Sequence, residues 1–212
     1  MAEQPIPGIS VLAGVNGAGK SSILGSFIEQ ADSTYVNPDT RTQAILAANP
    51  ELGSGEANSR AWREGVALLE RAIQNRQSYT FETTLGGDTI TACLQRAATL
   101  MPVRMWYVGL ASPEMHIARV RARVSKGGHD IPEEQIRARY ERSRVNLVEL
   151  LPKLSLLRVY DNSEEGDPDR GGRPRPQLLL DMRNGKIVSA VPLDTAPEWV
   201  QPILAGALNL AG

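Results

Sequence analysis

The segment that most constrains the fold is a glycine-rich loop at residues 8–28, GISVLAGVNGAGKSSILGSFI. Residues 14–21 fit the pattern G-x-x-x-x-G-K-[ST], a loop whose backbone cradles phosphate groups. The apolar run Ile9 to Ala13 predicts a strand, and Ser22 to Ile28 has the apolar spacing of a helix. The order strand, loop, helix therefore predicts a nucleoside triphosphate site in an α/β fold.

The residue types in this loop, hereafter the P-loop, explain how it would hold its ligand. Glycine permits positive φ and lets backbone N–H groups approach an anion, and the next helix adds a positive dipole end. The Lys20 ammonium can reach the β- and γ-phosphates, and the Ser21 hydroxyl can bind Mg²⁺. The predicted nucleotide-binding residues are Gly14, Val15, Asn16, Gly17, Ala18, Gly19, Lys20, Ser21 and Ser22, with Ser21 as the metal ligand.

Composition narrows the class of protein that carries the P-loop. The chain has 212 residues and a net charge of −1, so no bulk charge favours nucleic acid or an anionic membrane as a partner. No apolar stretch approaches the roughly 18 residues of a spanning helix, and residues 1–8 lack the features of a secretory signal. We therefore expect a cytoplasmic protein. Its lone Cys93 is expected to be buried and inert.

Strand and helix patterns alternate along the chain. Strands are expected at residues 9–13, 33–40, 78–85, 103–111 and 156–163, and helices at 22–28, after 59, and at 89–100, 113–124, 132–151 and 197–208. In the helix after residue 59, one apolar stripe comprises Trp62, Val66, Leu69 and Ile73. The alternation predicts a single α/β domain over residues 1–212, with a central parallel sheet flanked on both faces by helices. Asn184-Gly185 predicts a β-hairpin within a C-terminal unit at about 176–210.

Several polar segments follow predicted strands. They are Gly14–Ser21, Asp39 at a helix start, Glu82–Thr84, and Ser112, which is expected to cap a helix that begins at Pro113. Parallel strands end at one edge of a sheet, where ligands bind in α/β proteins. We therefore expect these segments to gather at that edge.

Residues 113–151 form a predicted helical lid with a Gly-Gly break. Between Arg119 and Arg144 there are eight Lys/Arg and four Asp/Glu. A guanidinium stabilises charge on a transferring phosphoryl group, so the insert suits a lid over a triphosphate. For any single arginine the alternative is a solvated face with Glu–Arg pairs. RNA binding is disfavoured, because Tyr140 is the single aromatic residue of this patch and the chain is not basic.

Together these segments resemble the zeta toxin family of small P-loop kinases. The matching segments are AGVNGAGKSS, NPD, FETTL, VGLASPEMHIARVRARVSKGGHDIPEEQIRARYERSRVNL and YDNS, spread over residues 11–163. The resemblance implies transfer of the γ-phosphate of ATP, with Mg²⁺, to the 3′-hydroxyl of UDP-N-acetylglucosamine. It also implies a toxin that is inhibited by a separate helical antitoxin.

The resemblance carries roles to individual residues. Lys20 and Ser21 would hold ATP and Mg²⁺, and Asp39 would be the base that accepts the proton of the sugar hydroxyl. A carboxylate suits that role, although a position at a helix N-terminus also explains Asp39. Glu82 and Thr84 match substrate contacts of the family, and Glu82 could instead hold Mg²⁺ through water. Glu64 would be a further substrate carboxylate, or a plain exposed residue.

The catalytic arginines of the predicted lid stay open at this level. Arg119 and Arg123 are both candidates for the first, ahead of Arg121. For the second, His129 occupies the natural position and is expected to be structural, so the next helix offers Arg137 or Arg139. The same fold acting on another sugar nucleotide or a nucleoside is an alternative function, and so is a slow ATPase that regulates a partner. The YDNS segment is where the adenine is expected.

Overall fold

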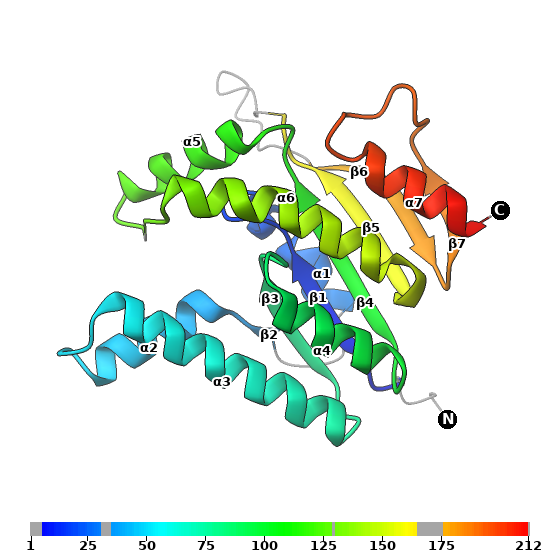
Figure 1. Cartoon of the computed structure of the whole chain (residues 1–212). Coiled ribbons are helices and arrows are strands. Elements are labelled where there is room, and N and C mark those ends of the chain that lie inside the picture. Colours follow the sequence, from blue (N-terminus) through cyan, green and yellow to red (C-terminus); the bar gives the residue numbers. More distant parts are fainter. Residues whose placement is uncertain (1–5, 31–34, 129, 165–175, 212) are drawn as a thin grey trace.

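A seven-stranded sheet forms the centre of the molecule (Figure 1). The computed structural model describes residues 6–30, 35–128, 130–164 and 176–211. The spatial order of the strands is β2-β3-β1-β4-β5-β6-β7. The first five strands pair in parallel, and the last two are antiparallel. Their bounds are β1 Ile9–Ala13, β2 Tyr35–Val36, β3 Tyr79–Thr83, β4 Val103–Gly109, β5 Leu156–Asp161, β6 Gln177–Arg183 and β7 Lys186–Ala190. The predicted α/β fold with a central, mostly parallel sheet is confirmed.

The helices lie close to their predicted positions. They are α1 Leu24–Gln30, α2 Pro38–Ala48, α3 Ser54–Gln74, α4 Asp88–Ala98, α5 Pro113–Val124, α6 Glu133–Leu150 and α7 Gln201–Ala211, with 3₁₀ turns η1 Lys20–Ser22 and η2 Leu151–Lys153. The predicted cap of α5 is present, since the Ser112 side chain accepts a hydrogen bond from the Met115 N–H and Pro113 is the first helical residue. No helix in the described part of the chain is long and apolar enough to cross a membrane.

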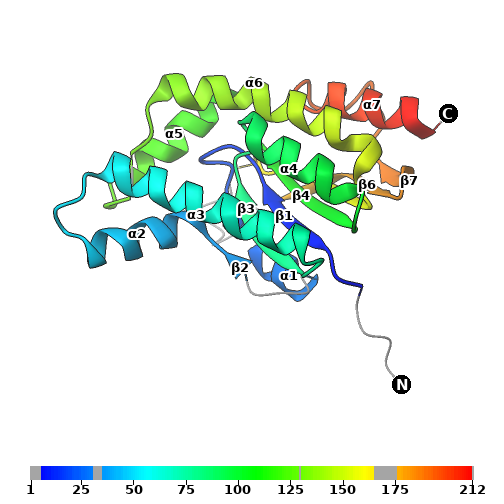
Figure 2. The ribbon, with the colours of Figure 1, turned by 60° about the horizontal axis from the view of Figure 1, so that its bottom comes forward.

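The two faces of the sheet are covered unequally. Helices α3, α4, α6 and α7 lie on one face, whereas α1 lies on the other (Figure 2). The larger core joins those four helices to inward-facing residues such as Val11, Met105 and Leu157. The smaller core places Phe27 of α1 edge-on against Trp106 of β4, with ring centroids 5.1 Å apart. Coverage by helices on both faces, as predicted, is therefore confirmed, although four of these helices pack on one face and α1 packs on the other.

The structure corrects several element boundaries. The helix after the P-loop begins as the 3₁₀ turn η1 instead of at Ser22, and α3 begins at Ser54, five residues before the predicted loop was expected to end at Ser59. The chain is extended only at β2 within the described part of the predicted second strand, because α2 already begins at Pro38. The C-terminal helix begins at Gln201 instead of Pro197, after a run of turns.

The apolar stripe of α3 is the clearest departure from the predicted core. Leu69 and Ile73 are buried, Val66 is half-buried, and Trp62 is 51% exposed. The helix buries Ala57 and Ala61 against α2 instead. At the other end of the sheet the predicted hairpin is confirmed: Asn184 and Gly185 both have positive φ, as a two-residue type I′ turn requires. Cys93 is buried, as predicted.

Candidate active site

The P-loop leaves β1 at the carboxyl edge of the sheet. Positive φ angles of 145°, 82° and 78° occur at Gly14, Gly17 and Gly19, a backbone region that favours glycine. A side chain at Gly14 would also collide with the Val108 carbonyl of β4. The Gly14 N–H donates to the Thr83 carbonyl at 3.1 Å. The start of the P-loop is therefore fixed between β3 and β4.

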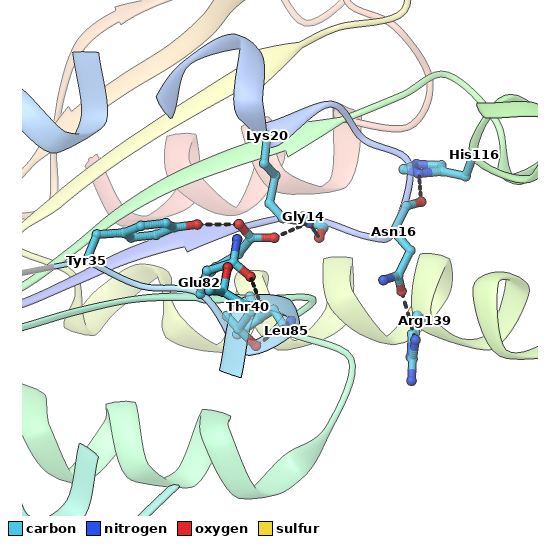
Figure 3. A network of polar contacts seen from close by, with 11 residues as sticks. Gly14, Asn16, Lys20, Tyr35, Thr40, Glu82, Leu85, His116 and Arg139 are labelled. Atoms are coloured by element: carbon cyan, nitrogen blue, oxygen red, sulfur yellow. Dashed lines mark hydrogen bonds and ion pairs between the residues drawn. The ribbon is translucent and has the colours of Figure 1, made fainter. Parts of the chain in front are cut away.

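Lys20 points back across the loop to the end of β3 (Figure 3). Its side chain is 9% exposed, and its Nζ donates to the Gly14 carbonyl at 2.6 Å. The same Nζ lies 3.3 Å from Glu82 Oε1, while Glu82 Oε2 accepts a hydrogen bond from the Tyr35 hydroxyl. Beside the P-loop, the Lys20 ammonium can bind an anion, and the Glu82 carboxylate can orient a second, polar ligand.

The tip of the P-loop is held from α5 and α6. The Nδ1 atom of His116 lies 2.9 Å from the Asn16 carbonyl oxygen, and Arg139 Nη1 donates to Asn16 Oδ1 at 2.8 Å (Figure 3). A Cβ on Gly17 would lie 2.5 Å from the His116 carbonyl oxygen, so the backbones are in close contact. The His116 ring packs edge-on against Tyr140 of α6, with centroids 5.6 Å apart. Both helices of the predicted lid therefore contact one P-loop residue.

Burial governs the charge of His116. The imidazole is 1% exposed, and its pKa is lowered to about 4. Desolvation is the main cause, the Lys20 and Arg119 charges add to it, and the hydrogen bond to Asn16 opposes it. His116 is neutral at pH 7. Because a carbonyl oxygen only accepts, we assign the proton to Nδ1.

Asn162, directly after β5, holds the second half of the P-loop. Its Nδ2 donates to the Ala18 carbonyl at 2.9 Å and lies where a side chain on Gly19 would need to be. Its own carbonyl accepts a hydrogen bond from Arg119 Nη2 at 2.8 Å. Asn162 therefore connects Arg119 of α5 to the loop. This residue belongs to the YDNS segment where the adenine is expected.

The other arginines of α5 and α6 are engaged elsewhere. Arg123 shares a surface hollow of about 470 Å³ with Arg119 and Lys126. Ion pairs join Arg121 to Glu133, Arg137 to Glu114 at 2.6 Å, and Arg142 to Asp88. Of the candidates, Arg119 and Arg139 thus lie at the P-loop. Arg121 and Arg137 form ion pairs elsewhere, and Arg123 lines the hollow beside Gly127 and Gly128. His129 is outside the described residues. Desolvation lowers the pKa of Arg139 but leaves it charged at any physiological pH.

The predicted substrate residues lie on α2, on α3 and at the end of β3. Asp39 is the second residue of α2, which contacts β3. Glu64 of α3 pairs with Arg41 at 2.9 Å and with Arg60 at 3.2 Å. Hydrogen bonds from Arg41 and Arg60 lower the pKa of Glu64. Glu64 therefore forms ion pairs with two arginines in this structure.

The loop after β3 is pinned in an unusual backbone conformation. Leu85 is fully buried with φ of 54°, a value rare outside glycine. Its N–H donates to Thr83 Oγ1 at 3.0 Å, and its carbonyl accepts from Asn146 Nδ2 of α6 at 2.8 Å. These contacts fix the backbone on both sides of Thr84, which is half-buried.

The oxygen donors at this edge suit a hard cation. Ser21 is exposed at the end of the P-loop, and the Glu82 carboxylate is oriented by Lys20 and Tyr35. Hydroxyl and carboxylate oxygens together with phosphate and water are the usual ligands of Mg²⁺. No group of three His, Cys, Asp or Glu that could hold a metal by itself occurs in the described ranges.

Sequence patterns missed several residues that shape this site. His116 and Asn146 look like ordinary polar positions of two helices, yet they are buried against backbone that lies 100 and 61 residues away in sequence. A polar residue on an otherwise buried helical face was the available signal for both. Asn162 was indicated only as part of YDNS.

Comparisons with known proteins bear on the family and the fold of the chain. The family model described as zeta toxin matches residues 1–167. An uncharacterised protein of Haemophilus influenzae is 34% identical over 131 residues, which cover 60% of this chain and 88% of that protein.

Two solved structures share the fold at low identity. The crystal structure of AvrRxo1-ORF1:-ORF2 with ATP has a TM-score of 0.60 and 16% identity, and covers 97% of this chain and 77% of that one. The PezAT toxin–antitoxin system of Streptococcus pneumoniae has a TM-score of 0.54 and 17% identity, and covers 84% and 73%. At these identities the similarity concerns the fold.

Proposed function

This chain belongs to the zeta toxin family, and on that premise we propose that it is an ATP-dependent kinase whose acceptor is a nucleotide sugar. We take UDP-N-acetylglucosamine as the first candidate and its 3′-hydroxyl as the attacking group. The observation that carries the proposal is the convergence of Lys20, Glu82 and Arg139 on one P-loop. A site that only bound an anion would need the P-loop alone, without Glu82 and Arg139.

The donor half of the proposed site has cations from three elements. Lys20 contacts the β- and γ-phosphates after releasing the Gly14 carbonyl. Arg139, held at Asn16, and Arg119, held at Asn162, approach the phosphates from α6 and α5. An arginine that reaches a transferring phosphoryl group contributes on the order of 10³-fold or more to turnover. Mg²⁺ bound by Ser21, with Glu82 acting through water, would neutralise charge on the phosphates.

The acceptor half supplies the base. The hydroxyl oxygen attacks the γ-phosphorus, the bond from that phosphorus to the β–γ bridging oxygen breaks, and ADP leaves with the electron pair. Asp39 takes the hydroxyl proton. Glu82 and Thr84, at the end of β3, position the sugar, with Glu64 as a further substrate contact once Arg41 and Arg60 yield. The start of α2 beside β3 supports this arrangement.

A toxin role and an antitoxin partner are part of the proposal. The PezAT structure is described as a toxin–antitoxin system, and AvrRxo1-ORF1 was solved together with AvrRxo1-ORF2. Family membership supports the same organisation here. A separate helical protein that covers the nucleotide edge would inhibit the kinase.

Mass spectrometry of reactions with ATP, Mg²⁺ and a panel of nucleotide sugars tests the kinase. The wild type should add one phosphate to UDP-N-acetylglucosamine, and Asp39→Asn should lose this activity while it still binds ATP. Arg137→Ala is the matched control for Arg139→Ala, because Arg137 pairs with Glu114 on the surface. If no nucleotide sugar gains mass and slow ATP hydrolysis is insensitive to Asp39→Asn, the kinase assignment is wrong and a regulatory ATPase is the better reading.

A further inference from the structure

Trp62 is a large aromatic side chain left half in solvent. It is 51% exposed, whereas Trp106 and Trp199 are 1% and 2% exposed. Single exposed apolar residues are common on protein surfaces, so exposure alone does not indicate a binding role. The position of Trp62 along α3 distinguishes it.

The face of α3 that carries Trp62 is the face that packs on the sheet. Trp62 precedes Leu69 by seven residues, which is nearly two full turns, so the two side chains leave the helix in almost the same direction. Leu69 is fully buried in the main core together with Phe81 of β3. Trp62 is therefore directed toward the sheet side of α3, yet its side chain stays half-exposed.

The direction of α3 relates Trp62 to one end of the sheet. The short connection at residues 75–78 turns the chain back, so α3 and β3 run in opposite directions (Figure 1). The N-terminal half of α3, which carries Trp62, therefore extends toward the carboxyl end of β3.

That end of β3 is the acceptor side of the proposed site. Glu82 and Thr84 are there, and α2, which begins at Pro38-Asp39, packs on α3 beside it. Gly87, where the β3–α4 loop ends, is exposed, and a side chain added there would meet no atom within 4 Å. The half-exposed indole of Trp62 lies on α3, which contacts α4, and such a flat ring is suited to stack on a planar group.

We propose that Trp62 stacks on the base of the nucleotide-sugar acceptor and so contributes to the choice of acceptor. The inference rests on the proposed kinase function. Stacking of an aromatic side chain on a nucleobase is worth roughly five- to hundredfold in affinity. A tryptophan provides this with little ordering cost, because its indole has few rotatable bonds.

Intrinsic fluorescence reads this residue selectively. Acrylamide should quench the exposed Trp62 and leave the two buried tryptophans nearly untouched. UDP should protect Trp62 from acrylamide, and N-acetylglucosamine 1-phosphate, which lacks a base, should not. ADP should not protect it either, because the donor nucleotide binds at the P-loop. Equal protection by ADP or by the baseless sugar phosphate would overturn the inference.

Steady-state kinetics provides the second measurement. Trp62→Leu should raise the KM for the nucleotide sugar about tenfold and leave the KM for ATP unchanged, and Trp62→Phe should restore most of the loss. Leu208→Ala, which trims another exposed apolar side chain far along the chain on α7, is the control and should change neither.

The outcomes separate the inference from the function on which it rests. Phosphorylation of a nucleotide sugar with an acceptor KM that is indifferent to Trp62→Leu rejects stacking and keeps the kinase. Protection of Trp62 by UDP without phosphate transfer to any nucleotide sugar keeps the base site and rejects the kinase assignment. Absence of both rejects both.

Discussion

The donor and acceptor sides of the proposed site differ in how deeply their residues are buried. At the P-loop, the side chains that hold the backbone are His116, Asn162 and Lys20, which are 1%, 2% and 9% exposed. Around α2 and α3, the Glu64 and Arg41 side chains are 35% and 38% exposed, and Trp62 is 51% exposed. Buried hydrogen bonds fix a geometry, whereas exposed ion pairs exchange easily with water and ligand. We infer that the fold preorganises the donor side and leaves the acceptor side adjustable.

The largest expected effect tests the donor side directly. Lys20→Ala removes the ammonium from the phosphates and removes the cation that pairs with Glu82, so we expect turnover to fall about 10³-fold. Time courses of ADP release measure the turnover. Thermal melts of the variant supply the control for folding. A fall of less than tenfold in a folded variant would contradict the central role of Lys20.

His116 tests whether the P-loop tip is preorganised. A carbonyl and the next N–H of the same peptide point in opposite directions, so His116 holds the Gly17 N–H toward the phosphate side by binding the Asn16 carbonyl. His116→Phe keeps the ring and loses the donor, and should weaken ATP binding about tenfold. His116→Asn keeps an N–H near the Nδ1 position and should restore most of it. Calorimetric titration with ATP compares the three proteins at pH 7.

The same residue predicts a pH dependence of stability. The pKa of His116 is lowered to about 4 in the folded state from an ordinary value of 6.5, so its stabilising contribution is present above pH 6.5. As pH falls toward 4 the unfolded chain binds the proton first, and up to roughly 3 kcal/mol of the free energy of unfolding is lost. Urea titrations between pH 7 and 4 should show a shallower loss for His116→Asn than for the wild type. Parallel curves would contradict a buried neutral imidazole.

Tyr35 tests the boundary between the two sides. Its hydroxyl donates to the Glu82 carboxylate, which also pairs with Lys20. Tyr35→Phe keeps the edge-on contact with Phe27, at 5.9 Å between centroids, and removes one hydrogen bond to a charged acceptor. We expect roughly a tenfold fall in kcat/KM. The split between kcat and the acceptor KM shows which side Glu82 serves.

The smallest effect is expected on the adjustable side. Glu64→Gln removes the charge that Arg41 and Arg60 share in an exposed setting, so the melting temperature should stay within error of the wild type. If Glu64 contacts the acceptor, the acceptor KM should rise severalfold while the KM for ATP is unchanged. An effect on the ATP KM would place Glu64 in the donor half and break the distinction between the two sides.

The sequence was sufficient for features that depend on local pattern. The fully buried run Ile9 to Ala13 and the glycine spacing after it are visible without a structure, as are the Ser112-Pro113 cap and the Asn184-Gly185 turn. Each of these is determined by residues within a few positions of one another.

Contacts between distant segments could not be predicted in this way. The choice of Arg139 over Arg137 depends on a contact with Asn16, which lies 123 residues away. The stripe of Trp62, Leu69 and Ile73 gave the correct face of α3, but periodicity contains no information about where the sheet beneath that face ends. The hydrogen bond from Asn146 to the Leu85 carbonyl likewise forms only when α6 is in place.

Leu85 also indicates the order in which parts of the domain fold. Its left-handed backbone is held by Asn146, which is 61 residues further along the chain, and such a conformation persists only when its surroundings impose it. During synthesis the β3–α4 loop has no reason to adopt this shape until α6 has emerged and docked. The acceptor edge should therefore form among the last parts of the domain, and chains that stop short of α6 should be inert even with a complete P-loop. For the proposed kinase, that ordering would keep unfinished chains from phosphorylating the acceptor.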